Sequence, residues 1–263
     1  MADRIGKMYS IDEKRGQILN KVFGGKILVP TEGHIVPFHC GILPTMRSYL
    51  LETIQTEENK RFRQQILTHP FWQAIEQGTL PKEKLALFAL QDYWLVKQAT
   101  RIDTLVIASM TDLLLRQLLM ERLAKQVLHR KDTLTTFAHA VGVTKKHLAS
   151  VTPIAGCMAL TTFFYWMIDN TDDLEKIVAI DASKEVFSLL CVKVKNSLMT
   201  NYHLSESEVD FFTVHDKWEE KLEPVDGYIR KQCKDPKVKE KVNQAISLAY
   251  QHELLFYDAI IAY

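Results

Sequence analysis

The sequence contains few of the residues that interrupt helices or cross-link chains. Glycine occurs 10 times, proline 8 times and cysteine 4 times among 263 residues. The cysteines are widely spaced and form no Cys-x-x-Cys pair, as is usual in a reducing compartment. No apolar run is long enough to span a membrane, and residues 1–16 lack the apolar core of a signal peptide. We therefore expect a cytoplasmic protein without a disulfide framework and without a membrane partner.

Several common kinds of functional site also lack support. The sequence contains no GxGxxG, GxxxxGK[ST], HExxH or GxSxG motif, which argues against glycine-loop phosphate binding, zincin proteolysis and α/β-hydrolase chemistry. Lys and Arg number 33 against 32 Asp and Glu, so the net charge is +1. Nucleic-acid-binding proteins usually carry a basic excess, and we expect no nucleic-acid partner.

The helix-breaking residues that do occur are unevenly placed. Six of the ten glycines and three of the eight prolines precede residue 45. Of the whole chain, 47% is hydrophobic, which is enough to form a core. This distribution predicts an irregular N-terminal arm over 1–45, with one β-like run at 26–30. The rest of the chain, 46–263, is predicted to form a single all-α domain.

Capping and breaking residues divide this domain into helices. Thr68 and Pro70 are expected to open a helix that ends at Gly78, and Pro81 opens a long one to about Ser109. Further helices are expected over 112–128, 132–141 and 237–262, with other helix starts at Thr144, Thr152, Asp181 and Ser205.

Polar residues embedded in apolar helices are the main functional signal. Gln91, Asp92 and Trp94 lie close together on the long helix. Amides, an aspartate and aromatic rings suit a pocket wall that stacks on a flat ligand and hydrogen-bonds to it. An ordinary amphipathic helix, with Asp92 facing water, explains the same spacing.

A second signal is a row of histidine and carboxylates. His215 and Glu219, with Glu223 or Asp226, are spaced about one helical turn apart. Such a row can ligate iron or manganese in a helical bundle. The alternative is a solvated face, since this stretch is rich in charge.

The third signal lies in the last helix, where Glu253 is surrounded by aromatic residues. Tyr250 precedes it by three positions, and Phe256 and Tyr257 follow it at three and four. A carboxyl buried among aromatic rings has a raised pKa and can act as an acid or base. A surface glutamate beside an aromatic core stripe is the competing interpretation.

In order and spacing, these pieces resemble the TenA (thiaminase II) and PqqC (pyrroloquinoline-quinone synthase) proteins of the heme-oxygenase-like superfamily, which also includes non-heme iron oxidases. The resemblance covers about 65–262. It is carried by the sequences His69-Pro-Phe-Trp, Gln91-Asp92-Tyr93, Phe137 to Gly142, Lys184-Glu185-Val-Phe187, Phe211 to His215, and Glu253 to Ala259.

On the thiaminase side, the resemblance implies an aminopyrimidine hydrolase. Asp92 matches the aspartate that binds the aminopyrimidine ring, and Glu253 matches the C-terminal acid/base. Cys157 and Cys191 lie on helices that could supply the catalytic cysteine, but neither follows a proline as the family cysteine does.

On the oxidase side, the resemblance implies a PqqC-like oxidoreductase. Glu185 matches a substrate-facing glutamate, and Val192 stands where a histidine is expected. Asp181, His215 and Glu219 are the candidate metal ligands. Gln91, Trp94 and Leu222 occupy positions where ligands are expected. The implied cofactor is therefore either none or a non-heme iron.

We expect a heme-oxygenase-like helical domain that oxidises a cyclic or heteroaromatic small molecule in a central pocket. The expected catalytic residues are Glu253, His215 and Glu185, and the expected substrate-binding residues are Gln91, Asp92, Trp94, Tyr250 and Tyr257. The alternatives are the aminopyrimidine hydrolase and a ligand- or partner-binding protein whose catalytic set has decayed. The resemblance also implies a homo-oligomer, such as a homodimer.

Overall fold

A computed structural model describes residues 56–128, 132–213 and 223–263, and these residues form helices and connecting turns with no strand. The prediction of an all-α fold is confirmed. The expected arm over 1–45 and its β-like run lie outside the described residues and stay predictions. The helices are α3 (Glu57–Leu67), α4 (Pro70–Glu76), α5 (Lys82–Ser109), α6 (Leu113–Leu128), α7 (Thr133–Ala140), α8 (Lys145–Ala149), α9 (Ala155–Asn170), α10 (Asp173–Asn201), α11 (Asp210–Thr213), α12 (Glu223–Gln232) and α13 (Pro236–Ala262).

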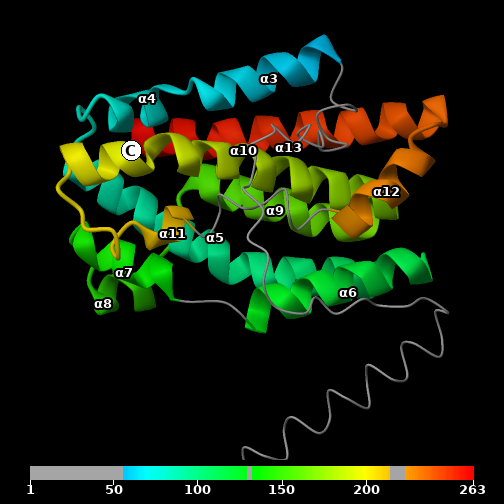
Figure 1. Cartoon of the computed structure of the whole chain (residues 1–263), viewed down its shortest axis with the longest axis horizontal. Coiled ribbons are helices and arrows are strands. Elements are labelled where there is room, and N and C mark those ends of the chain that lie inside the picture. The colour runs from blue at the N-terminus through cyan, green and yellow to red at the C-terminus, as the bar shows by residue number, and fades with distance from the viewer. Residues whose placement is uncertain (1–55, 129–131, 214–222) are drawn as a thin grey trace, which may run out of the picture. The chain divides into compact units, whose positions relative to one another are not determined.

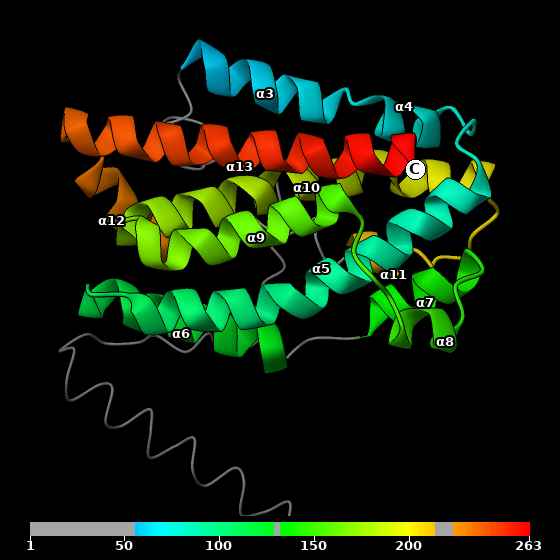
Figure 2. The same cartoon turned by 180° about the vertical axis from the view of Figure 1, so that it is seen from behind.

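The long helices α5, α9, α10 and α13 form the body of the bundle (Figures 1 and 2). Helix α13 packs against α9, α10 and α3, and α5 packs against α9. Both views place α3 and α4 above α13, with α6, α7 and α8 on the opposite side of the bundle. The middle of these four long helices is therefore enclosed on both sides.

Local sequence signals set many of the helix ends. Pro70 occupies the first turn of α4, and the Nδ1 atom of His69 accepts the Phe71 amide at 3.2 Å. The helix is thus capped by His69, one residue later than predicted, because Thr68 ends α3 instead. Gly78 has a φ of +69°, a left-handed conformation that favours glycine. The predicted helix from Pro81 to Ser109 is confirmed as α5.

The helix start predicted at Asp181 is wrong. Residue 181 lies inside α10, which begins after Asp172 and runs without interruption to Asn201. Asp172 and Glu175 form a capping box there, and the Asp172 amide donates to Glu175 at 2.9 Å. The helix start predicted at Ser205 is also wrong, because the residues that follow it form a turn. The Ser205 amide nevertheless donates to a Glu208 carboxylate oxygen at 2.7 Å.

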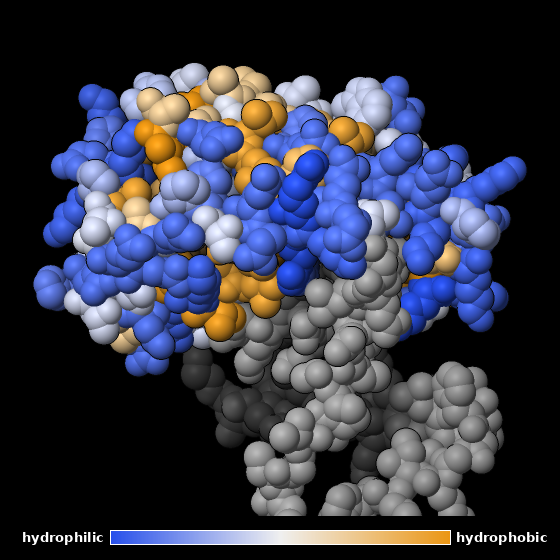
Figure 3. Space-filling model, turned by 90° about the horizontal axis from the view of Figure 1, so that it is seen from above, coloured by the Kyte–Doolittle hydropathy of each residue, from blue (hydrophilic) through white to orange (hydrophobic). Residues whose placement is uncertain are grey.

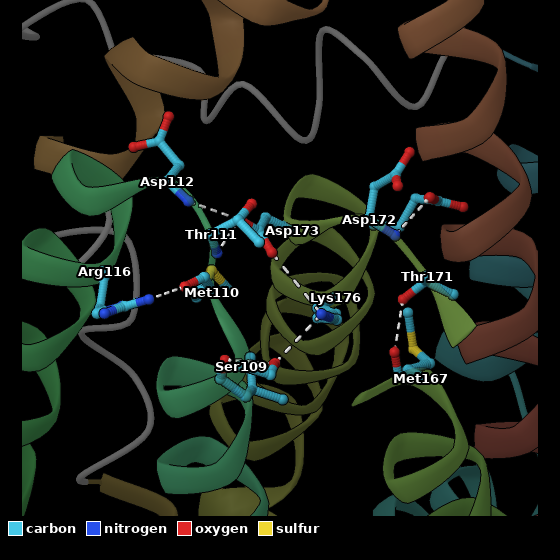
Figure 4. A network of polar contacts seen from close by, with 12 residues as sticks. Ser109, Met110, Thr111, Asp112, Arg116, Met167, Thr171, Asp172, Asp173 and Lys176 are labelled. Carbon is cyan, nitrogen blue, oxygen red and sulfur yellow. Dashed lines mark hydrogen bonds and ion pairs between the residues drawn. The ribbon is translucent and has the colours of Figure 1, made fainter. Parts of the chain in front are cut away.

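A polar network fixes the start of α10 against the turn between α5 and α6 (Figure 4). The Oδ2 atom of Asp173 accepts hydrogen bonds from the Thr111 amide at 2.7 Å and the Asp112 amide at 2.9 Å. The buried ammonium of Lys176 donates to Ser109 Oγ at 3.2 Å. In the same view Arg116 donates to the Met110 carbonyl oxygen. These contacts hold α5, α6 and α10 together at one end of the bundle.

Helices α9 and α13 approach closely at Gly156. A Cβ atom at this position would lie 2.2 Å from the Leu255 carbonyl oxygen and 2.6 Å from Ala259 Cβ. Only glycine allows this approach, which brings Cys157 of α9 and Glu253 of α13 into the same core.

The face of the molecule seen from above is largely hydrophilic with apolar patches (Figure 3). Among the described residues, Met158 and Trp166 of α9 and Leu248 and Leu255 of α13 are exposed large apolar side chains. The homo-oligomer stays a prediction. None of the described helices combines the length and apolar character that crossing a bilayer requires.

Candidate active site

The centre of the bundle holds a group of buried polar side chains from four helices. Asp92 of α5 is 3% exposed, Glu253 of α13 is 5% exposed and Ser183 of α10 is 6% exposed. Cys157 of α9 and Tyr257 of α13 are also buried beside them. Burying polar groups is costly unless they are paired, so this concentration requires an explanation.

The two carboxyl groups favour their neutral forms. Burial and, to a lesser extent, the negative charge of Glu253 together raise the pKa of Asp92 from its ordinary 3.8 to about 7. Burial also raises the pKa of Glu253 from 4.5 to about 7, although Ser183 and Tyr257 stabilise its charged form. No described cation forms an ion pair with either group. Near neutral pH the pair can therefore hold or release a proton at little cost.

Several buried polar atoms around this pair make no hydrogen bond among the described residues. They are Asp92 Oδ2, Ser183 Oγ and Tyr250 OH. Ser183 and Tyr250 lie near Glu253 and Arg63, respectively, but without hydrogen bonds of normal geometry. A buried group without a partner costs about 1–3 kcal/mol, so these atoms are suited to contact a polar ligand.

Gln91, predicted to bind substrate, instead contacts the backbone. Its Oε1 accepts the Ile154 amide at 2.9 Å, and its Nε2 donates to the Thr152 carbonyl oxygen at 3.2 Å. Both ends of the amide are occupied, and they fix the loop that leads into α9. Its role in substrate binding stays a prediction.

Glu185 and Asp181 each face an arginine. Arg63 of α3 donates to both oxygens of Glu185, at 2.6 and 3.2 Å. Arg122 of α6 lies 3.0 Å from Asp181 Oδ1 and donates to Oδ2 at 3.1 Å. Their predicted roles as a substrate-facing group and a metal ligand remain untested.

The described residues do not supply a set of metal ligands. Among them, no three His, Cys, Asp or Glu side chains lie close enough together to hold a metal ion. Asp181 is paired with a cation, which competes with a metal for its oxygens. His215 and Glu219, the other two predicted ligands, lie outside the described residues.

Cys157 is poorly suited to act as a nucleophile. Burial, followed by the charges of Asp92 and Glu253, raises the pKa of its thiol to about 12. Its Sγ atom donates to the Gln91 carbonyl oxygen at 3.5 Å. Because the thiolate is the reactive form, this cysteine is largely inert near neutral pH. Cys191 is fully buried as well.

Sequence reasoning missed Ser183, Arg63 and Arg122. Ser183 was interpreted as part of a helix start, and the two arginines come from helices distant in sequence from their partners. The absence of glycine and proline from 173–201 is the signal that places Ser183 inside a helix.

The arrangement of the helices defines the class of protein, an all-α heme-oxygenase-like fold. A solved domain of unknown function from Shewanella denitrificans, described as having this fold, matches with a TM-score of 0.66 at 18% identity. The match covers 78% of this chain and 89% of that chain.

Two TenA homologues are similar in structure. The TenA homolog from Pseudomonas syringae matches with a TM-score of 0.68 at 13% identity, over 81% of this chain and 92% of that chain. The TenA homologue from P. horikoshii matches with a TM-score of 0.64 at 19% identity, over 81% and 98%. These identities establish the fold alone.

A family model then gives the narrower assignment. Residues 57–186, just under half of the chain, match the model of the TENA/THI-4/PQQC family, so this stretch is similar to that family. The predicted resemblance is confirmed. No curated protein matches the chain.

Proposed function

We propose that this protein is a TenA-type enzyme that hydrolyses a small aminopyrimidine. The proposal rests on one observation above all: Asp92 and Glu253 are buried together, both with a pKa of about 7, and neither is neutralised by a described cation. Such a pair suits acid–base chemistry near neutral pH.

Asp92 has the chemistry to recognise an aminopyrimidine. Its Oδ2 atom is buried and has no hydrogen-bond partner among the described residues. A protonated carboxyl can donate to a ring nitrogen while its second oxygen accepts from the adjacent amino group. These two polar contacts would select a flat amino-heterocycle. Trp94 lies two residues after Asp92 on α5, and side chains at that spacing do not face each other, so its role in substrate binding stays a prediction.

Glu253 would supply and then recover the proton. Its protonated carboxyl donates to the amine of an aminomethyl-pyrimidine, and the methylene C–N bond breaks with its electron pair leaving on ammonia. A water molecule forms the new C–O bond, and its proton returns to the Glu253 carboxylate. The net reaction consumes water and releases ammonia and a hydroxymethyl-pyrimidine, with the enzyme unchanged.

Hydrolysis is preferred here to the PqqC-like oxidation first expected from the sequence. The structurally similar proteins include TenA homologues. Asp181, a ligand candidate for the iron alternative, is ion-paired with Arg122.

The direct test is ammonia release from an aminomethyl-pyrimidine carrying a ring amino group. We expect wild-type protein to release ammonia, and Asp92→Asn and Glu253→Gln each to lower the rate by about 100-fold or more. Glu83→Gln on α5 and Glu240→Gln on α13 are matched controls, because both carboxylates are exposed. These controls should retain wild-type rates.

Two outcomes would overturn the proposal. The first is that no ammonia is released. Oxygen consumption would then indicate an oxidase, and return of the bound pyrimidine unchanged would indicate a binding protein. The second is hydrolysis that persists in both carboxyl variants.

A further inference from the structure

Ser183 of α10 is a buried hydroxyl that its own helix does not satisfy. Serine and threonine inside helices commonly donate to a carbonyl one turn earlier. Thr161 of α9 does so, with Oγ1 donating to the Cys157 carbonyl oxygen at 3.1 Å. Ser183 is 6% exposed, yet its Oγ atom makes no hydrogen bond within the described part of the chain.

This hydroxyl lies beside the carboxyl group of Glu253. Helices α10 and α13 pack together, and Ser183 stabilises the charged form of Glu253 without reaching normal hydrogen-bond geometry. The other groups that interact with Glu253 are Asp92 from α5, Cys157 from α9, and Tyr257 and Tyr250 from α13. A buried hydroxyl that lies beside a carboxylate and has no hydrogen-bond partner of its own can share a bridging water molecule with it.

We propose that Ser183 and Glu253 together hold the attacking water, which makes Ser183 a catalytic residue of the hydrolysis proposed above. The water donates one proton to the Glu253 carboxylate and its other hydrogen to Ser183 Oγ, while the Ser183 hydroxyl hydrogen is directed toward the same carboxylate. Its oxygen then forms the C–O bond as the C–N bond breaks, and Ser183 keeps its own proton throughout. The serine orients the water and forms no covalent bond. This inference rests on the proposed function.

Kinetics of Ser183→Ala test this role. The substitution removes one buried oxygen, and a helix accommodates alanine well. With the aminomethyl-pyrimidine as substrate, we expect kcat to fall by about 100-fold, while KM changes by less than about 3-fold. Because Ser183 stabilises the Glu253 carboxylate, the part of the pH–rate profile that reflects Glu253 ionisation should move to higher pH. Ser188→Ala removes another buried serine of α10 and should leave the profile in place.

An infrared titration of the Glu253 carboxyl tests the contact without relying on activity. The carboxyl band is assigned by difference against Glu253→Gln, and Ser183→Ala is expected to raise the pKa of Glu253. An unchanged pKa, or a kcat equal to that of wild type, would overturn the role of Ser183. If the wild type releases no ammonia, the proposed function fails, while the titration still decides whether Ser183 contacts Glu253.

Discussion

Replacing Asp92 by asparagine should change the free energy of unfolding more favourably at alkaline pH than at acidic pH. The wild-type carboxyl is 3% exposed, and burial with the nearby charge of Glu253 raises its pKa from 3.8 to about 7. Asparagine has a similar shape and does not ionise, so it removes the cost of burying the charge. At low pH, where Asp92 is protonated in both the folded and the unfolded wild-type protein, this cost should be nearly absent.

The sign follows from the raised pKa. Below pH 3.8 the carboxyl is neutral in both folded and unfolded chains. As the pH rises, the unfolded chain ionises first, and the folded state becomes relatively less stable until the pH passes about 7. A pKa change from 3.8 to about 7 corresponds to about 4 kcal/mol. Of this, about 3 kcal/mol develops between about pH 5 and about pH 8.

Urea unfolding at these two pH values measures the effect. The change in the free energy of unfolding caused by Asp92→Asn should be about 3 kcal/mol more favourable at about pH 8 than at about pH 5. Losses from packing or from the new amide hydrogens act equally at both pH values and cancel in this difference. Glu83→Gln, an exposed change on the same helix, should alter stability by less than about 0.5 kcal/mol at either pH.

A pH difference below about 1 kcal/mol would refute the reasoning. A difference of the opposite sign would be more informative, because it would mean that the folded protein stabilises the Asp92 carboxylate. Asp92 would then need a cationic or multiply donating partner, and the protonated Asp92 carboxyl on which the proposed ring recognition depends would be lost.

Two further substitutions test the contacts between the helices of the bundle. Gly156→Ala places a Cβ atom 2.2 Å from the Leu255 carbonyl oxygen, so α9 and α13 must separate; we expect thermal unfolding to show a loss of about 3 kcal/mol. Gly227→Ala, where no atom lies within 4 Å, is its control and should be neutral or stabilising, so equal losses in both variants would argue against the steric explanation. For Asp173, burial alone raises the pKa, but hydrogen bonds from Asp112 and Thr111 and the charge of Lys176 lower it overall. Its stabilising contribution is therefore present above the ordinary pKa and lost as the pH falls through the lower folded value. Asp173→Asn should cost about 1–3 kcal/mol at neutral pH and much less at about pH 3, as measured by urea unfolding; a cost independent of pH would contradict this account.

Helices were predictable where their signals are local. Pro81 and an unbroken helical period are enough to define α5, and Pro70 and Gly78 mark the ends of α4. Asp181 was misread because Asp-Ala-Ser resembles a helix start. Inside α10 its buried carboxylate pairs with Arg122, which comes from α6. A sequence pattern within α10 carries no information about that distant partner.

The candidate site was predictable only where its signals are local in the sequence. Asp92 and Glu253 were found through their local motifs and the family resemblance. Whether they lie near each other depends on how α5 and α13 pack. Gln91 belongs to the same motif as Asp92, yet both ends of its amide bind the backbone before α9. Residue type and helical position could not separate these two roles, because the difference lies in the partners that the fold supplies.

The partners of the buried acids distinguish two kinds of carboxylate in the bundle. Asp181 and Glu185 are each held by an arginine, from α6 and α3 respectively, and those ion pairs connect α10 to helices on opposite sides. Asp92 and Glu253 have no such cation among the described residues and are held near neutrality by burial. An arginine beside either one would stabilise the fold at neutral pH, but it would also fix the charge and prevent proton transfer. The instability predicted for Asp92 and the acid–base role proposed for Glu253 therefore have the same physical cause, and one titration of the pair tests both.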